Sequence, residues 1–254
     1  MKSCLAIAIA GTSAALMSMA NAASTVQGFD ISNYQPSVNF QGAYSSGARF
    51  VFIRVLSTID LPRSIYTGLL TDCLLQATQG STTDPYFSTH WEGATNAKLY
   101  RAGYHYAEPT QSSGTTQAQY FVENGGNWTS DGQTLPGMLD LEAGPSGETC
   151  YGLSASSMVS WITEFVNTYH SATSRYPVLY TSASWWSECT GNSNSFSETC
   201  PISLASYGVS SVGTIPGGWS SQTIWQNSDS YSYGGDSDLF NGDEDRLKAL
   251  VSGS

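Results

Sequence analysis

The sequence predicts an α/β fold, an irregular TIM-like β/α barrel with eight strands and fewer than eight helices. Short β-rich runs alternate with helical patterns along most of the 254-residue chain. Such alternation is typical of parallel strands joined by crossover helices. Several connections between the runs are too short to hold a helix, so a complete outer ring of eight helices is not expected.

Eight runs are predicted as strands, and each ends in polar or aromatic residues. They span residues 26–31, 50–54, 101–106, 136–142, 177–181, 202–205, 223–226 and 238–240. In a barrel of this type the chemistry lies where strands end at their C-terminal face. Functional side chains are therefore sought at the ends of these runs.

The clearest helix begins after Ser154, a candidate N-cap. Apolar residues then recur at helical spacing and form one face, which the sequence assigns to the core. They are Met158, Trp161, Ile162, Phe165, Val166 and Tyr169. Further helices are predicted over residues 115–124 and 244–251.

The composition excludes several classes of function. The chain carries 9 Lys and Arg against 20 Asp and Glu, a net charge of −11. Nucleic-acid binding requires clustered cations, which this sequence lacks. Charged residues make up 11 % and aromatic residues 12 %, a balance that fits neither a coiled coil nor a disordered chain.

The N-terminus has the pattern of a secretory signal peptide. Lys2 precedes an apolar run, and Ala20-Asn21-Ala22 forms a small-residue cleavage site. A membrane anchor needs about 20 apolar residues, and the polar segment at 11–13 interrupts this run. We expect a leader at residues 1–22 and a secreted, extracellular, soluble domain at 23–254, with no membrane partner.

Four cysteines remain after the leader: Cys73, Cys150, Cys189 and Cys200. Cys189 and Cys200 bracket a turn-rich segment and are the first candidates for a disulfide. Cys150 could be a partner instead, and all three pairings of four thiols stay open. The sequence has no C-x-x-C pair and no H-E-x-x-H helix, so a zinc site has little support.

Asp140-Leu141-Glu142 is the most informative triplet for chemistry. Residues two apart on a strand face the same side, so both carboxyl groups are expected to point into the barrel mouth. Two close carboxyl groups cannot ionise independently, and the one that keeps its proton can act as a general acid. Glycoside hydrolysis uses such a pair, and Asp30 and Asp238 lie at other predicted strand ends.

Aromatic and amide side chains at strand ends are candidates for binding a sugar substrate. They are Tyr104, His105, Tyr106, Tyr180, Trp225 and Gln226. For His105, lining the cleft and packing in the core are equally consistent with the sequence. A serine nucleophile is disfavoured, because no G-x-S-x-G elbow is present.

Several motifs together resemble glycoside hydrolase family 25, the CH-type lysozymes, and most closely its fungal members. They are VQGFDIS at 26–32 with Tyr34-Gln35, FVFIR at 50–54, GYHY at 103–106, DLE at 140–142, IWQ at 224–226 and DLF at 238–240. The order is that of the family and covers nearly the whole mature chain. The resemblance implies an irregular barrel that hydrolyses the β-1,4 bond between N-acetylmuramic acid and N-acetylglucosamine in bacterial peptidoglycan.

The same resemblance implies roles for individual residues. Glu142 would be the general acid/base, and Asp140 would assist by stabilising positive charge or by orienting the substrate's acetamido group. Asp30 and Asp238, rather than Asp236, match the family's other cleft acids, and Tyr34 would contact substrate. No metal or cofactor is implied, and a monomer is expected. Two alternatives stay open: hydrolysis of chitin or a related polymer, and a non-catalytic protein that binds cell walls.

Residues 55–76 depart from the family pattern. Family members pass from the FVFIR strand almost directly into a segment like Ala77-Thr78-Gln79-Gly80, whereas 22 residues intervene here. This stretch begins with valine, whose codons start with GT, and ends with glutamine, which CAG can encode. Those are intron borders, and we interpret the atypical insertion as retained or mispredicted intron. The alternative is an apolar insertion beside the catalytic face, which could obstruct the cleft.

Overall fold

The computed structural model describes residues 24–57, 82–144 and 147–253. The expected leader at 1–22 lies outside these residues. So does most of the insertion at 55–76, including Cys73. Both expectations therefore remain predictions.

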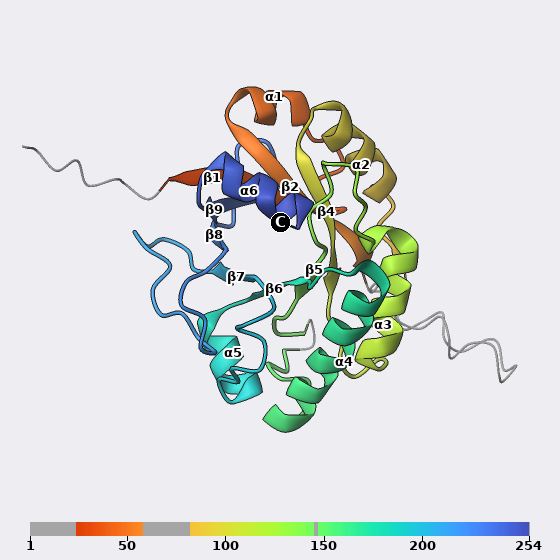
Figure 1. Ribbon diagram of the computed structural model, residues 1–254, viewed down its shortest axis with the longest axis vertical. Helices are drawn as coiled ribbons and strands as arrows, with labels where there is room; N and C mark the ends of the chain where they lie inside the picture. Colours follow the sequence, from red (N-terminus) through yellow and green to blue (C-terminus); the bar gives the residue numbers. More distant parts are fainter. Residues whose placement is uncertain (1–23, 58–81, 145–146, 254) are drawn as a thin grey trace, which may run out of the picture.

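A closed barrel of eight strands forms the centre of the described structure (Figure 1). Its strands are β1 (Thr25–Ile31), β2 (Ala48–Ser57), β4 (Tyr100–Tyr106), β5 (Met138–Asp140), β6 (Val178–Thr181), β7 (Ile202–Ala205), β8 (Ile224–Ser228) and β9 (Asp236–Asn241). They pair in the order β1-β9-β8-β7-β6-β5-β4-β2, and β1 closes the ring by pairing with β2. A ninth, two-residue strand, β3 (Thr82–Thr83), pairs with the end of β2. The predicted fold class is confirmed.

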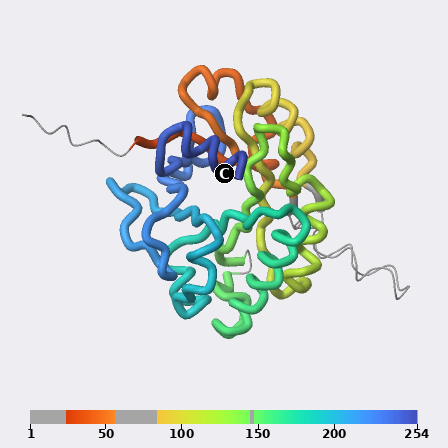
Figure 2. The backbone as a smooth tube through the Cα atoms, in the orientation of Figure 1, coloured from red at the N-terminus to blue at the C-terminus, as the bar shows by residue number. Residues whose placement is uncertain are grey.

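One strand runs against the predicted direction. β9 is antiparallel to both β8 and β1, whereas the other barrel pairs are parallel. A parallel connection needs a crossover of a dozen or more residues, and only residues 229–235 separate β8 from β9. The chain instead turns back tightly at Gly234 and Gly235, both with positive φ. Figure 2 shows the result, with the red N-terminal segment beside the blue C-terminal part of the chain.

Six α-helices surround the barrel in the described part of the chain. They are α1 (Phe40–Ser45), α2 (Phe87–Asn96), α3 (Gly114–Phe121), α4 (Ala155–Thr173), α5 (Ala183–Thr190) and α6 (Glu244–Ser252). The prediction of α4 is confirmed: the Ser154 hydroxyl accepts the backbone N–H of Ser157, and the predicted apolar face is buried. A π-helical turn, η2 (Val122–Gly126), follows α3 where the sequence predicted a continuous helix. None of these helices has the length and apolarity needed to cross a bilayer.

The barrel interior is apolar at its lower end and polar at its upper end, as β2 shows. Phe50 and Phe52 of β2 fill the lower half, followed two residues later by Arg54. This alternation follows from the two-residue period of a strand. Gly28 of β1 leaves room for the Phe50 ring, which would lie 2.3 Å from a Cβ atom at residue 28. Above this packed lower half, the described residues leave an open cavity at the upper end of the barrel.

Helix α6 covers the lower end of this interior. Leu247 and Val251 are buried and belong to the same apolar cluster as Phe50 and Phe52. A second apolar cluster lies between the barrel and its surrounding helices, and it includes Phe121, Phe165 and Tyr169. The barrel is thus closed below and supported outside, while its upper end carries the polar residues.

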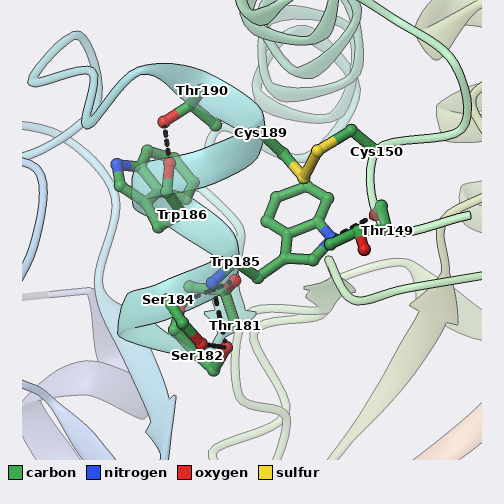
Figure 3. Close-up of a disulfide and its surroundings, with 9 residues drawn as sticks. All are labelled: Thr149, Cys150, Thr181, Ser182, Ser184, Trp185, Trp186, Cys189 and Thr190. Atoms are coloured by element: carbon green, nitrogen blue, oxygen red, sulfur yellow. Dashed lines mark hydrogen bonds between the residues drawn. A yellow bond between two sulfur atoms is a disulfide. The ribbon is translucent and has the colours of Figure 1, made fainter.

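The disulfide joins Cys150 to Cys189, 39 residues apart in sequence, so the Cys189–Cys200 pairing expected first is wrong. Cys189 on α5 faces the loop that follows β5, and Trp185 lies beside the bridge, where its Nε1–H donates to the Thr149 carbonyl at 2.8 Å (Figure 3). Cys200 is a buried free thiol. The turn-rich segment 190–200 is closed by its own contacts instead, including the Cys200 N–H to the Phe196 carbonyl at 2.8 Å.

We predict that replacing both bridged cysteines by alanine lowers the free energy of unfolding by about 2–4 kcal/mol, because the bridge restricts the unfolded chain. Urea unfolding of the double variant Cys150→Ala/Cys189→Ala measures this loss. Cys200→Ala is the matched control, since it removes a buried cysteine without breaking a bridge and costs about 1 kcal/mol. Equal losses in both variants would contradict a stabilising role for the bridge.

Candidate active site

A cavity of about 400 Å³ opens at the upper end of the barrel. Its lining combines carboxyl groups, tyrosines and one cation, contributed by most of the barrel strands and the loops after them. The lining residues are Asp30, Ile31, Ser32, Tyr34, Gln35, Arg54, Tyr104, Tyr106, Met138, Asp140, Glu142, Tyr180, Tyr207, Gln226, Gly235 and Asp236. This is the end of the parallel strands at which the sequence placed the chemistry.

Asp140 and Glu142 line this cavity together, as the triplet predicts. Asp140 is the last residue of β5 and is buried, with its Oδ1 atom lacking a hydrogen-bond partner in the described structure. Glu142 lies beyond the strand and is exposed at the cavity mouth, while Leu141 between them is buried in the core. The alternation continues because the Leu141 N–H still bonds to the Tyr180 carbonyl of β6 at 2.9 Å.

The loop that carries Glu142 is fixed at several points. The Tyr106 hydroxyl donates to the Ala143 carbonyl at 2.7 Å, directly after Glu142. Further along, the Tyr151 hydroxyl donates to the Ala107 carbonyl at 2.9 Å. Cys150 then ties the loop to α5. These contacts hold Glu142 in place although it lies outside the strand.

Gln226 of β8 links several side chains of the cavity wall by hydrogen bonds. Its Nε2 atom donates to Asp30 at 2.7 Å and approaches Asp236 at 3.4 Å. Its Oε1 atom accepts hydrogen bonds from the hydroxyls of Tyr180, at 2.6 Å, and Tyr207. The amide is 3 % exposed, so a buried donor and acceptor are both satisfied by cavity residues.

Crowding of carboxyl groups raises their pKa values. Burial, then the charge of Asp236, raises the pKa of Asp30 to about 7. Beneath it, burial and the charge of Asp30 raise the pKa of Asp238 well above its usual range, and the two share a hydrogen bond. Burial and the neighbouring Glu142 do the same to the pKa of Asp140. Desolvation and Asp236 also raise the pKa of Glu142.

The structure brings most of the expected site residues together. Those that line the cavity are Asp30, Tyr34, Tyr104, Tyr106, Asp140, Glu142, Tyr180 and Gln226. Asp238 is 2 % exposed and lies below the cavity rather than in its wall.

Two expected substrate-binding residues lie outside the cavity wall. His105 follows Tyr104 on β4 and therefore points the other way, where it stacks on Phe165 at 5.5 Å. Burial lowers the pKa of His105 to about 4. Trp225 precedes Gln226 on β8 and likewise points outward, donating to the Ser206 carbonyl at 2.8 Å. For both residues the strand alternation decides the direction.

Among the residues in this wall to which the sequence assigned no role are Arg54, Tyr207 and Asp236. Arg54 belongs to the FVFIR strand motif, and its position two residues after Phe52 would have placed it on the inward face. Tyr207 follows the end of β7, where other strands carry site residues. Asp236 lies two residues before Asp238 and therefore faces the same side of β9. Because β9 is antiparallel to its neighbours, Asp236 lies closer to the cavity mouth.

The described residues include no group of three His, Cys, Asp or Glu side chains arranged to hold a metal ion. The carboxyl groups of the cavity are instead connected through Gln226 and through the hydrogen bond between Asp30 and Asp238. The chemistry that this arrangement supports is proton transfer between carboxyl groups and a bound substrate.

We predict that the protein is more stable at pH 5 than at pH 7.5. The folded cavity keeps protons on carboxyl groups that ionise near pH 4 in the unfolded chain, so unfolding releases protons and stability falls as pH rises. Because the pKa of Asp30 is about 7, the fall extends from about pH 4 to pH 7. For a domain of this size we expect a decrease in Tm of at least about 5 °C.

Calorimetry of wild type and Asp30→Asn across this range tests the prediction. The variant lacks one of the raised carboxyl groups, so its Tm should depend less steeply on pH. The scan stays above pH 4, because Arg101 and backbone N–H groups lower the pKa of Asp131 to about 2 and its contribution is lost only in acid. A wild-type Tm that is constant or rises between pH 5 and 7.5 would contradict the prediction.

Comparison with known proteins gives the family. Glycosyl hydrolases family 25 matches residues 67–236, a span that begins inside the insertion. The N,O-diacetylmuramidase of Chalaropsis sp is 53 % identical over 233 residues, which cover 90 % of this chain and 100 % of that protein.

Two solved structures agree with this family assignment. The muramidase from Trichobolus zukalii is 55 % identical with a TM-score of 0.79, and the family GH25 lysozyme from Aspergillus fumigatus is 51 % identical with a TM-score of 0.80. Each comparison covers 90 % of this chain and 100 % of the other. The resemblance predicted from the sequence is confirmed: this chain belongs to glycosyl hydrolase family 25 and is a glycoside hydrolase of the lysozyme type.

Proposed function

We propose that this enzyme acts as a monomer on bacterial peptidoglycan, cleaving the β-1,4 bond between N-acetylmuramic acid and N-acetylglucosamine. Glu142 is the general acid/base and Asp140 assists it. The observation that supports these roles is that both carboxyl groups line one cavity. Burial and neighbouring carboxyl groups raise the pKa values of both. A protonated carboxyl group beside a charged one is what glycoside hydrolysis requires.

We assign different roles to the two residues according to their depth in the cavity. Glu142 at the cavity mouth gives its proton to the glycosidic oxygen as the bond from that oxygen to C1 breaks. Asp140, deeper in the cavity, stabilises the positive charge at C1 or orients the acetamido group. Ionised Glu142 then takes a proton from the water that completes hydrolysis. Tyr104, Tyr106 and Tyr180 supply aromatic walls for the sugar rings.

The proposal extends to a modified substrate. The Chalaropsis relative is named an N,O-diacetylmuramidase. At 53 % identity over 90 % of this chain, we infer that muramic acid carrying both N- and O-acetyl groups is accepted here as well.

We predict that Glu142→Gln lowers the rate of peptidoglycan hydrolysis by at least about 10²-fold, the usual contribution of general acid catalysis. The amide keeps the shape of the side chain and removes the transferable proton. Mass spectrometry of the soluble fragments measures the rate and shows whether muramic acid is at the reducing end.

Glu148→Gln is the matched control, because Glu148 is exposed on the same loop and lies outside the cavity lining. Its rate should equal that of wild type, and circular dichroism should be unchanged in both variants. Full activity of Glu142→Gln would remove Glu142 from the acid role. Products from chitin and none from peptidoglycan would favour the alternative substrate, and no products from either would favour a wall-binding protein.

We also propose that the mature secreted protein begins at Ala23 and lacks residues 55–76. The disulfide fits an oxidising compartment outside the cytosol. The register of β2 and β3 supports removal of the insertion, because Leu56 pairs with Thr83 and Ser57 with Thr82. If Arg54 were joined to Ala77, residues 78 and 79 would take those two positions.

That junction would leave Gly80 and Ser81 between the paired strands. A two-residue connection with glycine first is the sequence of a type II′ β-hairpin. The shortened chain therefore closes with a favourable turn and without losing any barrel strand.

Peptide mapping by mass spectrometry of the protein secreted by its own source tests both proposals. We expect an N-terminal peptide that starts at Ala23 and a peptide in which Arg54 precedes Ala77. Peptides from within residues 55–76 would contradict the intron interpretation, and an N-terminal peptide from residues 1–22 would contradict the leader.

A further inference from the structure

Asn127-Trp128-Thr129 is the one N-x-S/T sequence in the 254-residue chain. This triplet is the acceptor pattern for an N-linked glycan, and its use requires an exported protein and an asparagine at the surface. The proposed leader and the disulfide between Cys150 and Cys189 support the first requirement. The second depends on how the folded chain presents Asn127.

Asn127 is exposed on a turn whose neighbouring residues are fixed. The buried Gly126 before it accepts the Tyr169 hydroxyl at its carbonyl oxygen, at 3.1 Å. The half-buried Trp128 after it packs under Arg175, whose guanidinium carbon lies 4.0 Å from the ring centroid. The backbone of Asn127 is extended, with φ −64° and ψ 142°. The side chain of Asn127 is therefore presented to solvent between two anchored residues.

This turn lies at the end of the barrel opposite the cavity. The Trp128 Nε1–H donates to the Val251 carbonyl of α6 at 3.1 Å, and α6 covers the lower end. Further along the same loop, Thr134 pairs with Arg101 near the start of β4. β4 has seven residues and therefore a length of about 20 Å, and the cavity lies at its other end. A glycan on Asn127 leaves the cavity open.

We propose that Asn127 carries an N-linked glycan in the secreted protein. Its Nδ2 atom forms a bond to C1 of the first N-acetylglucosamine of a lipid-diphosphate-linked oligosaccharide. The bond between C1 and the phosphate oxygen breaks, the lipid diphosphate leaves with that electron pair, and the Asn127 amide loses one proton. The transferase recognises the Thr129 hydroxyl in the chain before it folds, so the later burial of Trp128 is no obstacle.

This inference rests on the proposed export and on the intron interpretation of residues 55–76. An intron with GT and AG borders and a cleaved leader together place synthesis in a eukaryotic secretory pathway. That pathway supplies both the lipid-linked donor and the transferase. The hydrolysis of peptidoglycan has no part in the argument.

Peptide mapping by mass spectrometry of the protein secreted by its own source tests the proposal. We predict that an endoglycosidase that cleaves between the first two sugars leaves the mass of one N-acetylhexosamine on the peptide that contains Asn127. A peptide N-glycosidase should instead convert Asn127 to aspartate. An Asn127 peptide that is entirely unmodified would overturn the proposal.

Variants secreted by the same source assign the glycan to its residue. Asn127→Gln and Thr129→Ala each destroy the acceptor pattern and should lose the whole glycan mass, whereas Thr129→Ser keeps the hydroxyl and should keep the glycan. Asn167→Gln is the matched control, because Asn167 is exposed on α4 and is followed by Thr168-Tyr169, which completes no acceptor pattern. A glycan that persists in Asn127→Gln would contradict the assignment.

The same map separates the glycan from the export on which it rests. An N-terminal peptide that starts at Ala23 beside an unmodified Asn127 overturns the glycan alone, and a retained leader overturns both. The masses do not depend on hydrolysis, so the test stands even if the proposed activity fails. In the active protein, kcat/KM of Asn127→Gln should equal that of wild type, because the glycan lies opposite the cavity. A changed kcat/KM with unchanged thermal unfolding would contradict that placement.

Discussion

The repulsion among buried carboxyl groups is the constraint on which the upper half of this barrel depends. Asp140 and Asp238 are buried and Asp30 is half-buried within one small space, where like charges interact more strongly than in solution. The protein limits the cost by retaining protons, by the Gln226 amide and by the charge of Arg54. The remaining free-energy cost is offset by the stability of the rest of the fold, which is apolar below the cavity and behind the strands.

The lower half of the barrel supplies that support. Phe50 and Phe52 fill the interior beneath the acids, and α6 closes it with Leu247 and Val251. Because interiors are packed at the density of organic crystals, the wall beneath the carboxyl groups cannot relax away from them. The same rigidity extends to the loop after β5. Contacts through Tyr106 and Cys150 hold this loop, and with it Glu142, which lies beyond the end of the strand.

Local patterns in the sequence were enough to predict the strands and the longest helix, because alternation, capping and helical spacing act within a few residues. The inward direction of Asp140 follows from the same rule, although β5 ends at Asp140 and not at Glu142, where the predicted run ended. The short helices α1, α2 and α5 were not predicted, since each buries only a few residues and depends on the barrel for its stability. The pairing of Cys150 with Cys189 depends on which way α5 faces, a tertiary property.

The direction of β9 explains the most consequential difference between the predicted and the observed site. The resemblance to the family pointed to Asp238 rather than Asp236 as a cleft acid, and on a parallel strand the later residue would also lie nearer the catalytic end. β9 is antiparallel, so the order reverses: Asp236 pairs with Asp30 near the mouth, and Asp238 lies one layer deeper beside Gly28. The two acids consequently occupy different environments, one facing the cavity and the other sharing a hydrogen bond with Asp30. The sequence motif identified Asp238 alone, and only the direction of the strand shows that Asp236 is the one of the two that lines the cavity.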